Sequence, residues 1–237
     1  MTSTAGIPAG QLTIVLGCAA AALLVVLIRD IWLVARNVVT IAHEGGHAFV
    51  ALLAGRRLSG IQLHSDTSGV TVSRGKTHGP GMVATAMAGY ITPSLIGLGF
   101  AALLTNSKVT VLLWTTIILL AVMLIKIRNA YGVVSIVVTG LVVFAISRFT
   151  SVAVQAGFAY FFTWFLLFAG IKPIFELQSK RRRYRSPDSD ADQLARLTGV
   201  PGLLWVFLFG IVAVGALALS ASWLVPFDTL DRVFSGR

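Results

Sequence analysis

The chain has 237 residues, of which 56% are hydrophobic and 12% are charged, and its formal net charge is +10. A soluble domain needs more charged surface than this, so the composition predicts an all-α polytopic membrane protein. Continuous rather than alternating apolar runs disfavour a β-barrel, and basic residues placed mostly between those runs disfavour a nucleic-acid-binding protein.

Seven apolar runs approach or exceed the length of about 20 residues that a membrane-spanning helix needs. They cover about 11–28, 31–54, 82–104, 109–125, 133–146, 152–171 and 200–225. The pattern predicts about seven transmembrane helices in a single membrane-embedded domain over residues 1–237. The first ten residues lack the basic side chains of a secretory signal, so the first run is expected to be retained. Cys18 lies in this run, and a single cysteine excludes an intrachain disulfide.

The second run contains His43-Glu44-Gly45-Gly46-His47, which matches the zinc-binding pattern H-E-x-x-H. Residues four apart share one face of a helix, so both histidines can offer ring nitrogens to one ion. Glu44 is expected to take a proton from a zinc-bound water and to pass it to the leaving amine. Ionisable side chains inside a span are costly and usually functional, so the motif predicts one zinc ion per chain. The alternative roles are a hydrogen-bonded interior for each histidine and helix packing for the glycines.

Between the second and third runs, residues 58–74 alternate apolar and polar side chains around the turn sequence Asp66-Thr67-Ser68-Gly69. This alternation predicts a β-hairpin. Further along, Asn129 follows the fourth run and is expected to end a helix there, with Gly132 as the stop.

Basic residues predict the orientation, because cytoplasmic loops of membrane proteins carry an excess of lysine and arginine. They concentrate in the intervals after the second, fourth and sixth runs, which should therefore be cytoplasmic. With about seven spans, the N-terminus and the basic loop at about 172–189 lie in the cytoplasm and the C-terminus lies outside, in a multi-pass protein of the cell membrane. The basic stretch from Lys180 to Arg185 is interpreted as a solvated anchor, with a patch for anionic lipid as the alternative.

A catalytic zinc ion needs a third protein ligand and an open position for water. The candidates are His64, Asp66, His78, Asn129, Glu176, Asp188, Asp190 and Asp192. The acidic segment 186–192 is predicted on the cytoplasmic side, as is the end of the second run that carries the motif. It also directly precedes a helical stretch, residues 193–198, and the last run, so it can approach the metal without crossing the bilayer. Capping of that helix by Ser189 or Asp190 is the alternative role.

The H-E-x-x-H motif in an early span, the small hairpin after it and the acidic segment before a late span resemble the site-2 protease family of intramembrane zinc metalloproteases. The resemblance is closest to its compact bacterial membrane metallopeptidase-like branch and covers about Ile31 to Val225. It implies that His43 and His47 bind zinc and that Glu44 is the catalytic base. The family's third ligand is an aspartate, usually in an Asp-Gly pair, which this chain lacks. Asp190 is the best replacement and Asp192 the second choice.

The resemblance further implies that the substrate is a transmembrane helix of another protein, locally unwound and cut near the membrane face. The hairpin edge from Ile61 to His64 could hold the unwound segment by strand addition. The predicted function is therefore that of a zinc metalloendopeptidase in the lipid bilayer. One alternative is a non-proteolytic protein of the same fold that binds metal or membrane helices. The other is a transporter, although transporters tend to have repeated halves and no internal repeat is visible here.

Overall fold

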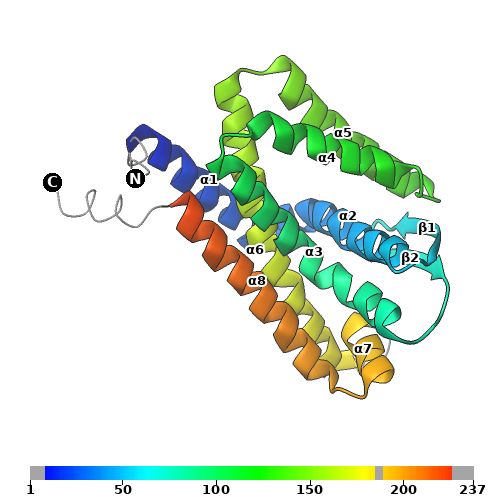
Figure 1. The fold of residues 1–237 in the computed structure, drawn as a ribbon. Coiled ribbons are helices and arrows are strands. Elements are labelled where there is room, and N and C mark those ends of the chain that lie inside the picture. The colour runs from blue at the N-terminus through cyan, green and yellow to red at the C-terminus, as the bar shows by residue number, and fades with distance from the viewer. Residues whose placement is uncertain (1–8, 185–188, 226–237) are drawn as a thin grey trace, which may run out of the picture.

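The computed structural model describes residues 9–184 and 189–225, which form eight helices and one β-hairpin (Figure 1). The elements are α1 (Ala9–Leu27), α2 (Arg29–Leu53), β1 (Arg57–Leu63), β2 (Gly69–Arg74), α3 (Pro80–Thr105), α4 (Val109–Leu124), α5 (Ala130–Phe149), α6 (Val152–Tyr184), α7 (Asp190–Thr198) and α8 (Gly202–Leu224). Each of the apolar runs corresponds to one helix, and the remaining helix, α7, begins within the acidic segment.

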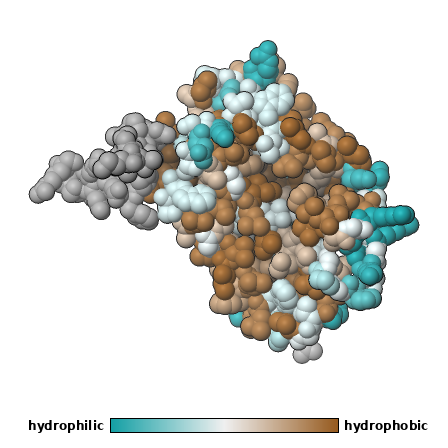
Figure 2. Space-filling view, in the orientation of Figure 1, coloured by the Kyte–Doolittle hydropathy of each residue, from teal (hydrophilic) through white to brown (hydrophobic). Residues whose placement is uncertain are grey.

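Four helices are long and apolar enough to cross a membrane, namely α3, α5, α6 and α8, and the bent pair α1–α2 adds a fifth if it counts as one span. Helix α4 is apolar but shorter, with 16 residues. Hydrophobic side chains dominate the surface over the helices, and hydrophilic ones gather toward the side of the hairpin (Figure 2). The multi-pass helical class is thus confirmed, whereas the predicted count of about seven spans is not.

A sharp bend between α1 and α2 determines the direction of the helix that carries the motif. The two helices meet at 101° with only Ile28 between them. Lys172 of α6 donates a hydrogen bond to the carbonyl of Val26 and lies 4.6 Å from the centre of the Trp32 ring. A cation is favourable at the C-terminus of a helix because the last carbonyls there have no partner within the helix. Lys172 therefore ties α6 to both sides of the bend.

The predicted hairpin is confirmed, with β1 and β2 paired in antiparallel register and an irregularity between Leu58 and Gly60. A third segment lies along the other edge of β1. The Ile61 N–H donates to the Lys126 carbonyl and the Arg128 N–H donates to the Ile61 carbonyl, both at 2.9 Å. The edge of β1 was predicted to hold an unwound substrate by strand addition. At Ile61 this edge is already occupied by the linker between α4 and α5.

Asn129 completes this contact, and its expected role at the end of a helix is wrong. It is the N-cap residue of α5, and its side chain binds the backbone of Leu63, accepting from the N–H at 3.2 Å and donating to the carbonyl at 2.6 Å. Gly132 lies in the first turn of α5, where an added Cβ would come within 2.7 Å of Asn129 Oδ1. The glycine therefore makes room for the Asn129 side chain instead of stopping a helix.

Helix α6 extends through most of the segment that was expected to be a basic loop. It has 33 residues and ends at Tyr184, with Arg181, Arg182 and Arg183 in its last turn. Pro173 lies inside α6 without ending it. The lysine, arginine, glutamine and glutamate residues that follow favour a helix, and basic side chains are favourable at a helix C-terminus, so the helix continues to Tyr184. The predicted loop is therefore wrong over 172–184, and 185–188 lie outside the described part of the chain.

Helix α3 is the centre of the fold and packs against α2, α6 and α8, whereas α4 and α5 pack mainly against each other (Figure 1). Gly46 of α2 allows a close approach to α3, because a Cβ there would lie 2.2 Å from Thr92 Oγ1 and 3.0 Å from the Ala88 carbonyl. Helix packing is therefore the role of this glycine. The close contact brings the histidine-bearing face of α2 against the first half of α3.

Candidate metal centre

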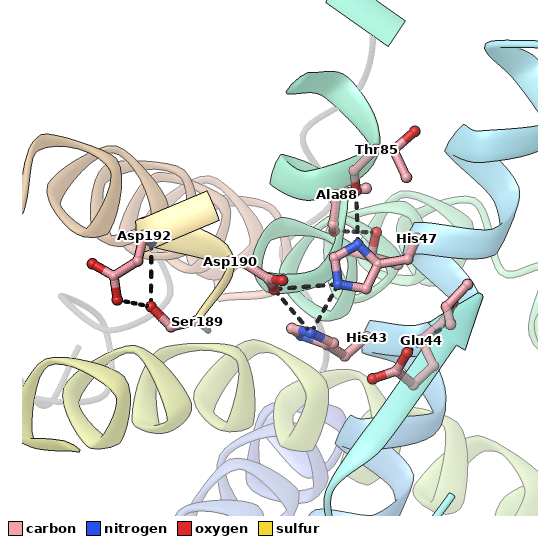
Figure 3. Close-up of polar contacts among 10 residues, drawn as sticks. His43, Glu44, His47, Thr85, Ala88, Ser189, Asp190 and Asp192 are labelled. Atoms are coloured by element: carbon pink, nitrogen blue, oxygen red, sulfur yellow. Dashed lines mark hydrogen bonds and ion pairs between the residues drawn. The ribbon is translucent and has the colours of Figure 1, made fainter. Parts of the chain in front are cut away.

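His43 and His47 lie one turn apart on α2 and direct their Nε2 atoms to a common point, 3.1 Å from each other. Asp190, the first residue of α7, completes a triangle with its Oδ2 atom 3.2 Å from both nitrogens (Figure 3). The fold thus brings the first-choice aspartate to the two histidines from the far end of the sequence. The same three residues form the one group of metal-binding geometry found among the described residues.

The dimensions of this triangle fit a zinc ion. Two ligand atoms bound to one tetrahedral zinc at about 2.0–2.1 Å lie roughly 3.3 Å apart. The three sides measured here are 3.1, 3.2 and 3.2 Å. Two imidazoles and one carboxylate also match the ligand types of catalytic zinc sites, which keep a fourth position for water.

A backbone hydrogen bond orients the His47 ring. Its Nδ1 atom lies 2.7 Å from the carbonyl oxygen of Thr85 in α3. A carbonyl oxygen only accepts, so Nδ1 carries a hydrogen and Nε2 is the ring nitrogen that faces the triangle. Metal-binding histidines are held in this way in general, with the second ring nitrogen donating to an oxygen.

Gly89 of α3 forms one wall of the triangle, and sequence reasoning missed it. A Cβ at this position would lie 2.4 Å from His47 Nε2 and 2.5 Å from His43 Nε2. The glycine is one of many small residues in this part of α3, so nothing in the local pattern distinguishes it. Only the position of α2 against α3 reveals that any side chain here would enter the metal centre.

The Glu44 carboxylate is held by β2. Its side chain is buried, and Thr71 Oγ1 lies 2.6 Å from Glu44 Oε2 and 3.1 Å from the Glu44 carbonyl. A Cβ at Gly69 would lie 2.7 Å from Glu44 Oε1, so the glycine allows β2 to approach this closely. The hairpin therefore orients the predicted base beside the two histidines (Figure 3).

Asp190 is positioned by the start of α7. Of the two residues predicted to cap this helix, Ser189 and Asp190, the N-cap residue is Ser189. Its Oγ accepts a hydrogen bond from the Asp192 N–H at 3.3 Å. Burial alone would raise the pKa of Asp190, but the neighbouring His47 charge and hydrogen bonds from His43 and His47 hold the pKa well below its usual range. The carboxylate is therefore ionised, as a metal ligand must be.

Asp192, the second-choice ligand, directs its carboxylate away from the triangle and onto Arg181, with Oδ1 2.7 Å from Nη2. Among the other candidates, Glu176 accepts from Trp32 Nε1 at 2.9 Å, and His78 is exposed. His64 and Asp66 bond to Ser68 in the hairpin turn, Asn129 binds Leu63, and Asp188 lies outside the described residues.

A cavity of about 130 Å³ lies close to the triangle, although none of the three triangle residues lines it. Tyr90 lines it and places its ring perpendicular to that of His43, with the two ring centres 4.8 Å apart. Ser189, next to Asp190, lines it as well, together with Arg36, Glu176, Lys180 and Arg181. The cavity thus lies between two neighbours of the triangle, Tyr90 and Ser189, and the basic end of α6.

The family model described as Peptidase M50B-like matches residues 16–220, which include the triangle, Glu44 and the hairpin. No curated protein and no solved structure matches the chain.

Proposed function

Since the chain belongs to the Peptidase M50B-like family, which is the site-2 protease family, we propose that it is an intramembrane zinc metalloprotease that hydrolyses peptide bonds of membrane-protein substrates. The observation that carries this proposal is the triangle of His43, His47 and Asp190 with the buried carboxylate of Glu44 beside it. A membrane protein has little use for this set of ionisable groups unless they bind an ion or perform chemistry.

In the proposed mechanism, His43, His47 and Asp190 hold one zinc ion per chain. When bound, the ion would polarise the scissile carbonyl and lower the pKa of a coordinated water. Glu44 accepts the proton of the attacking water and returns it to the leaving amine nitrogen. Thr71 keeps the Glu44 carboxylate in one orientation throughout, through the 2.6 Å hydrogen bond.

The proposed substrate is a transmembrane segment of another protein in the same bilayer, unwound where it is cut. Unwinding is required because the backbone groups of a helix are already paired with each other. With β1 occupied at Ile61, we assign the substrate strand to β2. Within the described residues, the sheet has two strands and its one additional bridge is on β1. A strand added to β2 would run past Gly69 and Thr71, the residues that contact Glu44.

The test is cleavage by the purified protein in proteoliposomes that contain single-span membrane proteins. We expect defined cleavage products, their loss on chelation, and their return with zinc. Asp190→Ala should bind zinc much more weakly, through His43 and His47 alone, and should lose cleavage. The matched control Asp66→Ala, at an exposed aspartate of the hairpin turn, should keep both zinc affinity and cleavage. Full zinc occupancy without cleavage of any substrate would instead favour a non-proteolytic, metal-binding relative.

The proposed orientation places the N-terminus and the basic end of α6 in the cytoplasm. A single cysteine introduced at the exposed Arg183, in a Cys18→Ser background, should react with a membrane-impermeant maleimide only when the cytoplasmic face is accessible. Labelling from the opposite face of intact cells would reverse the assignment.

A further inference from the structure

One arginine of the basic cluster at the end of α6 turns inward. Arg181 is partly buried, whereas its neighbours Arg182 and Arg183 are exposed. The Arg181 guanidinium contacts the Asp192 carboxylate with Nη2 2.7 Å and Nε 3.0 Å from Oδ1, and with Nε 3.2 Å from Oδ2. Its Nη1 donates to Gln178 Oε1 at 3.2 Å. The planar guanidinium is therefore held on two sides and joins α6 to α7.

Asp192 transmits this contact to the start of α7. Its Oδ2 accepts a hydrogen bond from the Ser189 hydroxyl at 2.5 Å, and its N–H lies 3.3 Å from Ser189 Oγ (Figure 3). Ser189 immediately precedes Asp190, whose carboxylate lies in the triangle. A continuous series of hydrogen bonds thus runs from Arg181 through Asp192 to Ser189, the residue that precedes the predicted zinc ligand.

Helix α7 depends on such contacts for its orientation. It has nine residues, and helices this short are not stable on their own in water. Ala191 and Leu194 anchor its apolar face in a cluster with α3, α6 and α8. The apolar contacts hold α7 against the bundle, but they do not determine the direction of the first turn as hydrogen bonds do.

We propose that Arg181 is a positioning residue of the metal centre, which acts through Asp192 and Ser189 to hold the Asp190 carboxylate at the two histidines. The proposal rests on the proposed function in one respect, that Asp190 is a zinc ligand. It assigns to Arg181 a role distinct from that of the exposed arginines beside it, which remain a solvated anchor.

A substitution at Gly202, the first residue of α8, can disturb the contact between Arg181 and Asp192 without removing the charge of the guanidinium. A Cβ at this position would lie 2.4 Å from Arg181 Nη2 and 3.1 Å from the Ala191 carbonyl of α7. Alanine is otherwise more favourable than glycine in a helix. Gly202→Ala should therefore displace the guanidinium while leaving α8 intact.

The test measures zinc affinity by competition with a chromophoric chelator, on the purified full-length protein. Arg181→Ala and Gly202→Ala should each weaken zinc binding about ten- to hundred-fold, the usual effect of removing a group that orients a metal ligand. Arg181→Lys should bind zinc with an affinity between those of Arg181→Ala and the wild type, because an ammonium group lacks the planar two-point geometry of a guanidinium. The matched control Arg182→Ala should bind zinc like the wild type.

A double variant separates positioning from a general loss of structure. If Arg181 acts through Asp190, then Arg181→Ala should weaken zinc binding no further in an Asp190→Ala background, where His43 and His47 remain. An equal loss in that background, or wild-type affinity in Arg181→Ala alone, would overturn the proposal. Cleavage is scored separately: a wild type that binds zinc but cleaves nothing refutes the protease and leaves the positioning role intact.

Discussion

Glu44→Gln is expected to slow cleavage severely while zinc stays bound. The change removes the proton-accepting carboxylate but keeps the length and shape of the side chain. The amide can still bond to Thr71, whose hydroxyl lies 2.6 Å from Glu44 Oε2, so the hairpin contact should survive. A positioned general base contributes about 10²–10⁴-fold to a rate, and a loss of this size is expected in kcat. Initial rates on a reconstituted membrane substrate, with zinc measured on the same samples, check the result.

Two further variants make this test specific. Glu44→Asp keeps the carboxylate but withdraws it by one methylene, so it should retain part of the activity. Thr71→Val keeps the shape of Thr71 but releases the carboxylate, and it should lower kcat with little change in zinc content. If Glu44→Gln cleaved at the wild-type rate, Glu44 would not be the general base.

Gly89→Ala is expected to eliminate zinc binding and, with it, cleavage. The added methyl carbon would lie within 2.4–2.5 Å of atoms of both histidine rings, including the two Nε2 atoms. Such a contact has to be relieved, and α3 has little freedom to move because α2, α6 and α8 pack around it. The rings must therefore rotate away, and the triangle is lost. Zinc content by metal analysis of the purified variant is the direct measurement.

Gly99→Ala is the matched control, because it makes the same change in the same helix where nothing lies within 4 Å of the added carbon. Alanine should there leave zinc binding unchanged, and it is about 1 kcal/mol more favourable than glycine in a helix interior. Normal zinc affinity in Gly89→Ala would mean that the metal binds elsewhere.

Much of the fold was predictable because its signals are local. The apolar runs predicted helices at almost the observed positions, and the alternation around Asp66-Thr67-Ser68-Gly69 predicted the hairpin. The motif placed His43 and His47 on one helical face by spacing alone. Asp190 required an argument about which segments share one side of the membrane, and the structure places it beside both histidines.

The remaining features depend on partners far apart in the sequence. The sequence around Asn129 is typical of a helix end, and only the fold shows that its amide binds Leu63. Gly89 cannot be told from the other small residues of its helix until the histidines are placed beside it. Arg181 could not be distinguished from Arg182, because the difference lies in the position of Asp192. Local patterns report helices and turns, whereas these roles arise only when helices meet.

The shortness of α4 has a consequence for the lipid around it. Its 16 residues extend for roughly 24 Å, less than the hydrocarbon thickness of about 30 Å. A helix of this length can cross a bilayer only where the bilayer thins around it or where the linker after it lies below the headgroups. That linker is bonded to β1 at Ile61 and Leu63, and β2 contacts Glu44. Wherever α4 crosses the bilayer, the hairpin that orients Glu44 is therefore bonded to the linker beside which the lipid must adjust.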